Sequence, residues 1–186
     1  MKTFKEFYEE ETINEGFANV IGKVLGLGTF GVVTAWITAL LIKGGIGAIN
    51  SIADSFGKKG IELKKFVKEN KNSGAVKMQL NKMEEEKNKH KEEISGIIKA
   101  INEKNWDIAS GEFLSLPVDK KNSTEIKRII VAEIIKVTNQ LPISEPTPGN
   151  ECYRAIKKIV GLAVAKSLSK AVLEQATKAV QEQGVR

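Results

Sequence analysis

The chain contains little of the chemistry that enzymes and metal sites use. It has one cysteine and one histidine among 186 residues. Cys152 cannot form an internal disulfide, which fits a reducing interior or a particle assembled in the cytoplasm; we interpret it as a small apolar residue near a helix start rather than a reactive thiol. His90 has no nearby cysteine, and Glu86 and Glu93 at helical spacing indicate a metal only weakly. The sequence therefore predicts a noncatalytic protein without metal or cofactor, in which His90 is solvated.

Proline is also scarce, and three of the four prolines fall between residues 142 and 148, where they interrupt the helical pattern. Elsewhere apolar residues recur at helical spacing, and strand patterns are hard to find. We expect an all-α fold, a helical bundle with an antiparallel helical hairpin and a Gly-rich apolar N-terminal helix. The predicted segments are a propeptide at 1–15, a Gly-rich apolar segment at 16–56, a helical body at 57–141, a Pro-rich linker at 142–149 and a C-terminal helix at 150–186.

Within the body, a helix over about 45–70 is expected to pair with a second helix over 76–101 and to form the hairpin. The second helix has a charged middle, EEEKNKHKEE at 84–93, whose side chains we expect to form i, i+4 pairs in solvent. An irregular connector follows at 105–122, and Asn122 with Glu125 resembles a capping box for a helix over 126–140. The apolar face of that helix is broad, which predicts burial on more than one side. Asn150 is expected to cap a single final helix that continues to about Ala176.

Residues 24–42 form a run of nineteen residues without charge. A helix of that length spans about 28 Å, enough to cross a bilayer. Trp36 lies at its centre and not at an interface, which argues against a conventional membrane anchor. The run therefore predicts either a buried core helix or a membrane-active segment. Small residues recur here at intervals of four and would let a helix or membrane partner approach closely: Gly22 and Gly26, and Gly31, Ala35 and Ala39.

The same run contains the pattern GxGxxG, formed by Gly26, Gly28 and Gly31. In kinases and dinucleotide-binding folds this pattern binds phosphates, but only together with further motifs and a strand before the helix. The chain has neither a kinase catalytic loop nor strand and helix units around the glycines. We therefore interpret these glycines as a packing surface and not as a nucleotide site.

The formal net charge is +6 and the pI is about 9.3. Lysines provide most of this charge and arginine is scarce, which favours sequence-independent, salt-sensitive contact with DNA phosphate over reading of bases. The alternative is an ordinary solvated lysine face. The residues expected to contact phosphate lie in two stretches: Lys58, Lys59, Lys64 and Lys65, and Lys157 and Lys158.

The first fifteen residues, MKTFKEFYEEETINE, differ from the rest in being acidic and amphipathic. On a helix Phe4, Phe7 and Tyr8 share one side, and a protein groove could hold them. The segment carries two lysines against five glutamates, a charge of −3, so its removal would raise the formal net charge from +6 to +9. The alternative is a first amphipathic helix that packs on the body.

This segment resembles the capsid-targeting sequences of internal head proteins from T-even-type tailed phages. Those sequences open with Met-Lys-Thr/Ser, an aromatic residue, any residue and Glu-Phe, and end at a prohead-protease site of the form Ile/Leu-any-Glu before a small residue. The opening is matched by Met1, Lys2, Thr3, Phe4, Glu6 and Phe7, and the cleavage site by Ile13, Glu15 and Gly16. The likeness covers about a tenth of the chain, and the cut triplet recurs at 101–103 and 143–145.

The resemblance implies a noncatalytic internal virion protein that is targeted to the prohead, cleaved after Glu15, packaged with DNA and ejected into the host. Its implied partners are the prohead scaffold core, the prohead protease and DNA phosphate, followed by a host membrane or host protein. Its oligomeric state stays open. The alternative is a small membrane-associated phage or bacterial protein that is inserted through residues 24–42 and holds its lysine-rich helices on the inner leaflet.

Overall fold

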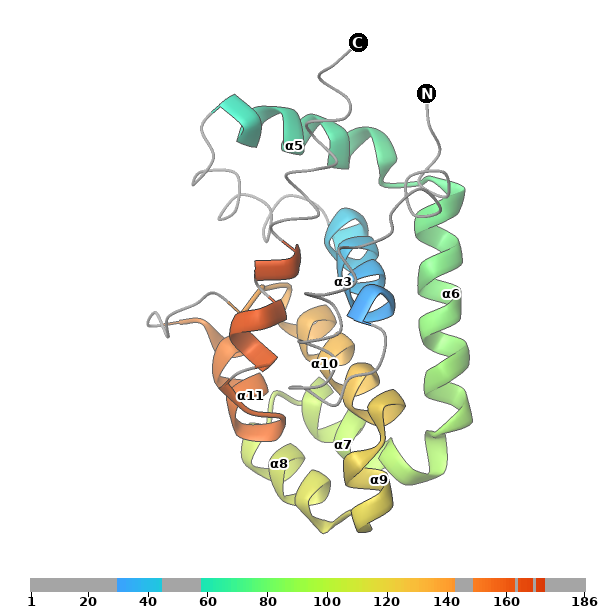
Figure 1. Ribbon diagram of the computed structural model, residues 1–186, viewed down its shortest axis with the longest axis vertical. Coiled ribbons are helices and arrows are strands. Elements are labelled where there is room, and N and C mark those ends of the chain that lie inside the picture. Colours follow the sequence, from blue (N-terminus) through green and yellow to red (C-terminus); the bar gives the residue numbers. More distant parts are fainter. Residues whose placement is uncertain (1–29, 45–57, 143–148, 163, 169, 173–186) are drawn as a thin grey trace.

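The computed structural model describes residues 30–44, 58–142, 149–162, 164–168 and 170–172, without the side chains of 30–35, 59, 63 and 75. These ranges are mostly helical and contain no strand. The all-α helical bundle that the sequence predicts is therefore confirmed (Figure 1). The helices in chain order are α3 (Phe30–Gly44), α5 (Lys58–Asn70), α6 (Gly74–Lys89), α7 (Lys91–Asn102), α8 (Trp106–Ser115), α9 (Val118–Asn122), α10 (Thr124–Thr138) and α11 (Glu151–Ile159).

Helix α10 lies at the centre of the bundle, and α3, α6, α7, α9 and α11 all pack against it (Figure 1). Every residue from 128 to 135 is buried, so the predicted burial on more than one side is confirmed. Ile126, Ile129 and Ile130 are 0% exposed, and each fully buried isoleucine stabilises the fold by about 1.5–3 kcal/mol. Arg128 and Glu133 are buried in the same stretch, which the apolar pattern did not predict.

The ends of α10 are set by single residues. The Ser123 hydroxyl accepts a hydrogen bond from the Ile126 N–H at 3.4 Å, so Ser123 and not Asn122 caps the helix. This prediction was wrong by one residue because serine and asparagine are both good caps. At the other end Asn139 has φ +50°, and its N–H donates to the Ile135 carbonyl at 2.8 Å. Asparagine tolerates this left-handed conformation, which stops the helix.

Helix α3 is a core element in the part whose side chains are described. Trp36, Ile37, Ala39, Leu41 and Ile42 are all buried, and α3 packs against α6 and α10 and more lightly against α5. Residues 36–42 thus follow the buried-core interpretation of the uncharged run. None of the described helices has both the length and the apolar character that a membrane crossing needs.

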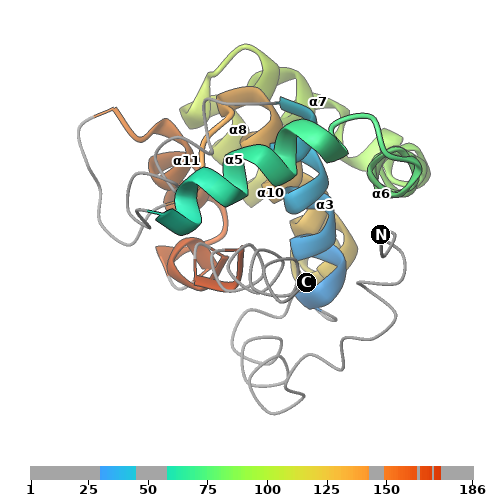
Figure 2. The same cartoon turned by 90° about the horizontal axis from the view of Figure 1, so that it is seen from above.

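The predicted hairpin differs from the observed arrangement. Helix α5 crosses over the end of α3 and does not run alongside α6, whose main partner is α3 (Figures 1 and 2). The second arm is also not continuous, because the chain bends at His90, where φ is −106° and ψ is 15°. At the bend the His90 side chain contacts Glu125 of α10, and within α6 Lys87 contacts Glu133 of the same helix α10. The most extensive helix contact in the described chain is that of α7 with α8, which follow one another in sequence.

Two further segments differ from the sequence expectation. The connector at 105–122 is helical, since Asn105 caps α8 by accepting the Ile108 N–H at 3.2 Å, and α9 follows Pro117. The final helix is interrupted, because α11 ends at Ile159 and Gly161 has φ +105°. The Gly161 N–H donates to the Ile156 carbonyl at 3.0 Å, the pattern of a glycine helix stop. Helix resumes beyond it and includes residues 164–168.

Candidate functional site

The predicted targeting and cleavage residues lie outside the described part of the chain. They are Phe4, Glu6, Phe7, Ile13, Glu15 and Gly16, and the packing glycines Gly22 and Gly26 lie outside it as well. Gly31 and Ala35 belong to α3, but their surroundings are not described; Ala39 is 0% exposed in the same helix. The second copy of the cut triplet is described: Ile101 is 0% exposed in the last turn of α7.

The predicted phosphate-contacting lysines lie on two separate helices, α5 and α11 (Figure 1). On α5, Lys58 and Lys65 are exposed, Lys64 is partly buried, and the side chain of Lys59 is not described. Lys65 Nζ lies 3.9 Å from Glu69 Oε1, a loose pair in solvent. Within the described chain Lys58 has no ion-pair partner, and neither do the exposed Lys68 and Lys71 nearby.

The lysines of α11 are less available. Lys157 and Lys158 are both exposed, but Lys158 is paired with Asp107 of α8. The Lys158 carbonyl also accepts a hydrogen bond from the Ser110 hydroxyl at 3.5 Å. The pairing neutralises part of this face, so α5 is the stronger basic surface of the two.

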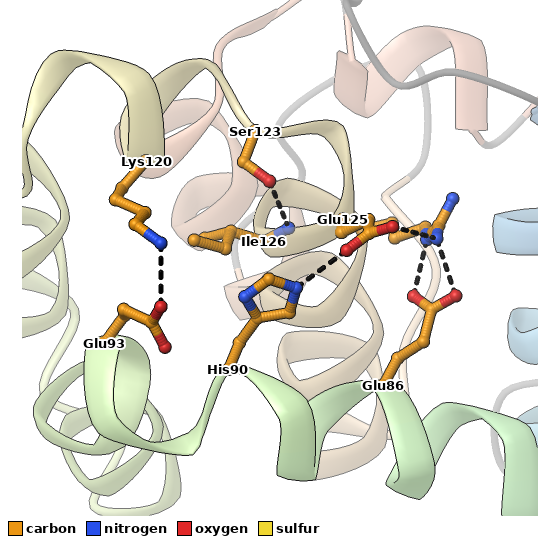
Figure 3. A network of polar contacts seen from close by, with 8 residues as sticks. Glu86, His90, Glu93, Lys120, Ser123, Glu125 and Ile126 are labelled. Atoms are coloured by element: carbon orange, nitrogen blue, oxygen red, sulfur yellow. Dashed lines mark hydrogen bonds and ion pairs between the residues drawn. The ribbon is translucent and has the colours of Figure 1, made fainter.

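The most extensive polar arrangement was not predicted. Charged side chains of α6 and the start of α7 meet those of α9 and α10 along an antiparallel line (Figure 3). We call this line the charged seam. Its contacts, from one end to the other, are Glu84 with Lys136, Lys87 with Glu133, Glu86 with Arg128, His90 with Glu125, and Glu93 with Lys120.

Arg128 makes the most directional contact of the seam. Its Nε and Nη2 donate to the two carboxylate oxygens of Glu86 at 2.8 and 2.6 Å, a bidentate geometry that only arginine provides. The guanidinium carbon lies 5.5 Å from the centre of the Trp36 ring, within cation–π range. The side chain of Arg128 is 10% exposed. Arg128 thus joins α6 to α10 and covers the central aromatic residue of α3.

Glu133 is the most deeply buried charge, with a side chain 1% exposed. Lys87 and Lys136 donate to its Oε1 at 2.8 and 3.3 Å, and Lys136 also donates to Glu84 at 3.1 Å. Burial alone would raise the pKa of Glu84, but Lys136 and then Lys87 bring it below its usual value. Burial alone would lower the pKa of Lys136, but the charge of Glu133 and the bond to Glu84 raise it. Two lysines thereby compensate a carboxylate that water hardly reaches.

The seam continues past the bend between α6 and α7. His90 Nε2 lies 2.8 Å from Glu125 Oε2 and donates to it, because a carboxylate can only accept. This contact lowers the pKa of Glu125. The Lys120 ammonium donates to Glu93 at 2.8 Å, which lowers the pKa of Glu93 and raises that of Lys120.

His90 is therefore not the solvated residue that the sequence predicted. Its side chain is 16% exposed and its Nδ1 is buried without a hydrogen-bond partner among the described residues. The Nε1 atom of Trp36 is in the same situation. One signal in the sequence could have revealed the seam: α10 carries Arg128 and Glu133 within an otherwise apolar stretch, and such charges need partners from another element.

The remaining chemistry of the described chain is limited. Cys152 is 0% exposed in α11, and burial raises the pKa of its thiol to about 12, against a smaller lowering by a hydrogen bond with Thr138. This agrees with the interpretation as a small apolar residue near a helix start. Within the described ranges no three His, Cys, Asp or Glu residues are grouped so that they could hold a metal ion.

Comparison with known proteins adds no relative. No family model matches the chain, and no curated protein or solved structure is significantly similar to it.

Proposed function

We propose that this chain is a noncatalytic internal virion protein of a tailed phage. Residues 1–15 direct it into the prohead, where they contact the scaffold core, and the prohead protease cuts after Glu15. The observation that carries the proposal is the combination of the opening MKTFKEF with Ile13, Glu15 and Gly16 at the distance of a short leader. Either pattern alone would be weak, and both together at one terminus are much more specific.

The charge distribution supports the second half of the proposal, packaging beside DNA. Removal of the acidic leader raises the formal net charge from +6 to +9, so processing makes the protein more attractive to phosphate. Helix α5 presents Lys58, Lys65 and Lys68 to solvent, and these can replace counterions along a DNA backbone without reading bases. Ejection with the genome, and action on a host membrane or protein, extend the proposal beyond the particle.

Mass spectrometry of the protein from purified particles tests the proposal. We expect an N-terminus at Gly16, and we expect Glu15→Gln to leave the leader attached because the cut site is lost. Deletion of residues 2–15 should leave the body folded but keep it out of the particle. Particles without the protein, or particles in which it still begins at Met1, would contradict the proposal.

DNA binding is tested separately on the processed chain 16–186. Lys58→Glu, Lys65→Glu and Lys68→Glu together should weaken binding to duplex DNA and reduce the salt slope by about 0.9 per lost phosphate contact. The matched control reverses three exposed lysines of α6 and α7, Lys77, Lys82 and Lys99. Equal losses in both variants would show that only net charge matters, and that α5 has no special role.

Membrane association through residues 24–42 remains the alternative, supported by the nineteen uncharged residues. It requires Trp36 and Ile42 to leave the core, where they are 0% and 2% exposed. This alternative predicts that the protein expressed alone sediments with membranes and is missing from virions.

A further inference from the structure

Helix α6 is attached to the molecule by little apolar surface. Among its described side chains, Val76 and Met83 are buried and Leu80 is partly buried. Burial of three such side chains stabilises by roughly 5–8 kcal/mol as an upper bound. The same helix supplies Glu84, Glu86 and Lys87 to the charged seam. Ion pairs are therefore a second set of contacts that hold α6, in addition to these apolar side chains.

The packing under α6 is also incomplete. A pocket of about 270 Å³, open to solvent, lies between α3, α6 and α10. Leu40, Leu80, Met83 and Ile135 provide apolar walls. Glu84 and Lys136, the first pair of the seam, line the same pocket. At this end of α6 the Glu84 and Lys136 pair borders the pocket, and Met83 packs in the core beside it.

The helical backbone is interrupted at both ends of α6. A short turn at 71–73 precedes it, and the Ser73 hydroxyl caps it by accepting the Val76 N–H at 3.3 Å. The bend at His90 follows it and separates it from α7, which packs on α8 and α10. Rotation at these two places can move α6 while α7, α8 and α10 stay together. The element under α6 is α3, whose residues 31–42 carry no charge.

We propose that α6 is a releasable cover over α3, latched by the charged seam and opened when acid neutralises the carboxylates of the seam. This goes beyond the proposed function and does not depend on it. The contacts that hold α6 to α10 are Glu84 with Lys136, Glu86 with Arg128 and Lys87 with Glu133, and His90 with Glu125 at the bend. Protonation of these carboxylates removes the negative partner of each pair and leaves the positive charge uncompensated.

The groups around the seam strengthen this effect. The positive charge of Lys89 in α6 helps to lower the pKa of Glu125, and Lys43 of α3 lines the same pocket as Glu84. Both positive charges remain after the carboxylates are protonated. Asp119 of α9 is a further carboxylate, near Lys120. The latch is intact above the usual carboxyl pKa of about 4.3 and weakens as the pH falls below it. That direction follows from the lowered pKa values of Glu84, beside Lys136, and of Glu125, bonded to His90, in the folded state.

Hydrogen exchange followed by mass spectrometry on the full chain tests the latch without any substitution. Between pH 7 and about pH 3, after correction for the intrinsic exchange rate, peptides from 74–89 and 36–44 should lose protection by about tenfold or more. Peptides from 94–101 and 126–135 should keep theirs. Loss of protection in all four regions together would mean global unfolding and would overturn the proposal, as would unchanged protection in 74–89.

A cross-link separates release of α6 from general loosening. Glu84→Cys with Lys136→Cys, joined by a short bismaleimide, ties α6 to α10, and buried Cys152 stays unmodified. The matched control, Asp107→Cys with Lys158→Cys, uses another ion pair and ties α8 to α11. The first link should preserve protection of 36–44 at about pH 3 and the second should not. The same exchange in both linked proteins would refute the latch.

Discussion

Replacement of Arg128 by alanine tests how much the charged seam stabilises the fold. The change removes two hydrogen bonds of 2.8 and 2.6 Å to Glu86 and the contact with Trp36. Loss of one partner from a buried pair costs about 3–5 kcal/mol, and the cation–π contact adds about 0.5–2 kcal/mol. Glu86 is 21% exposed and can regain some hydration. We therefore expect the free energy of unfolding to fall by about 3–4 kcal/mol.

Urea denaturation followed by circular dichroism measures this change. A double-mutant cycle with Glu86→Gln isolates the pair, and we expect a coupling energy of about 1.5–3 kcal/mol. The exposed pair Lys65 and Glu69 is the control, since its atoms are 3.9 Å apart and its side chains are 77% and 42% exposed; Lys65→Ala should cost less than about 0.5 kcal/mol. A coupling below about 0.5 kcal/mol between Arg128 and Glu86 would refute the reasoning.

Four other predictions follow from the described residues. Stability should be greatest between about pH 5 and pH 10. It should fall in acid because Glu84, Glu93 and Glu125 have lowered pKa values, and in base because Lys120 and Lys136 have raised ones. Urea midpoints across pH measure this dependence, and a midpoint independent of pH would contradict it. The Cys152 thiol, buried and with a pKa of about 12, should react with a disulfide reagent only at the rate of unfolding. Gly161→Ala, at φ +105°, should destabilise by about 1 kcal/mol or more, whereas Gly111→Ala, in open space on α8, should stabilise by about 0.5–1 kcal/mol; thermal denaturation compares them. If the prohead protease cuts this chain, it should leave the bond after Glu103 intact until the protein is unfolded, because Ile101 is 0% exposed, and digestion of native and urea-treated protein would show the difference.

Elements defined by local patterns were predictable. The apolar spacing indicated helices throughout, the broad apolar face of 126–140 indicated the central position of α10, and Asn150 caps α11 by accepting the Tyr153 N–H at 3.0 Å. These features depend on neighbours within one or two helical turns, and a single sequence contains that information.

Features that depend on distant partners were not predictable. The run 84–93 is as hydrophilic as a solvated helix face. It contains one local pair, Glu84 with Lys87, but its partners on α9 and α10 lie 27 to 52 positions further along the chain. The predicted pairing of α5 with α6 was wrong for the same reason, because α3 and not α5 occupies the apolar side of α6. Gly161 was overlooked because a glycine within an apolar helical pattern is usually tolerated, and only the φ of +105° shows that it ends a helix.

The distances along the chain between seam partners also bear on how the protein folds. Neighbouring helices such as α7 and α8 can meet after closing a short loop, but the ion pair between Glu84 and Lys136 closes a loop of 52 residues. Loop closure entropy makes such high-contact-order pairings late events, after local pairs have formed. We therefore expect substitutions in the seam to give φ-values near zero, so that they speed unfolding and leave the folding rate almost unchanged.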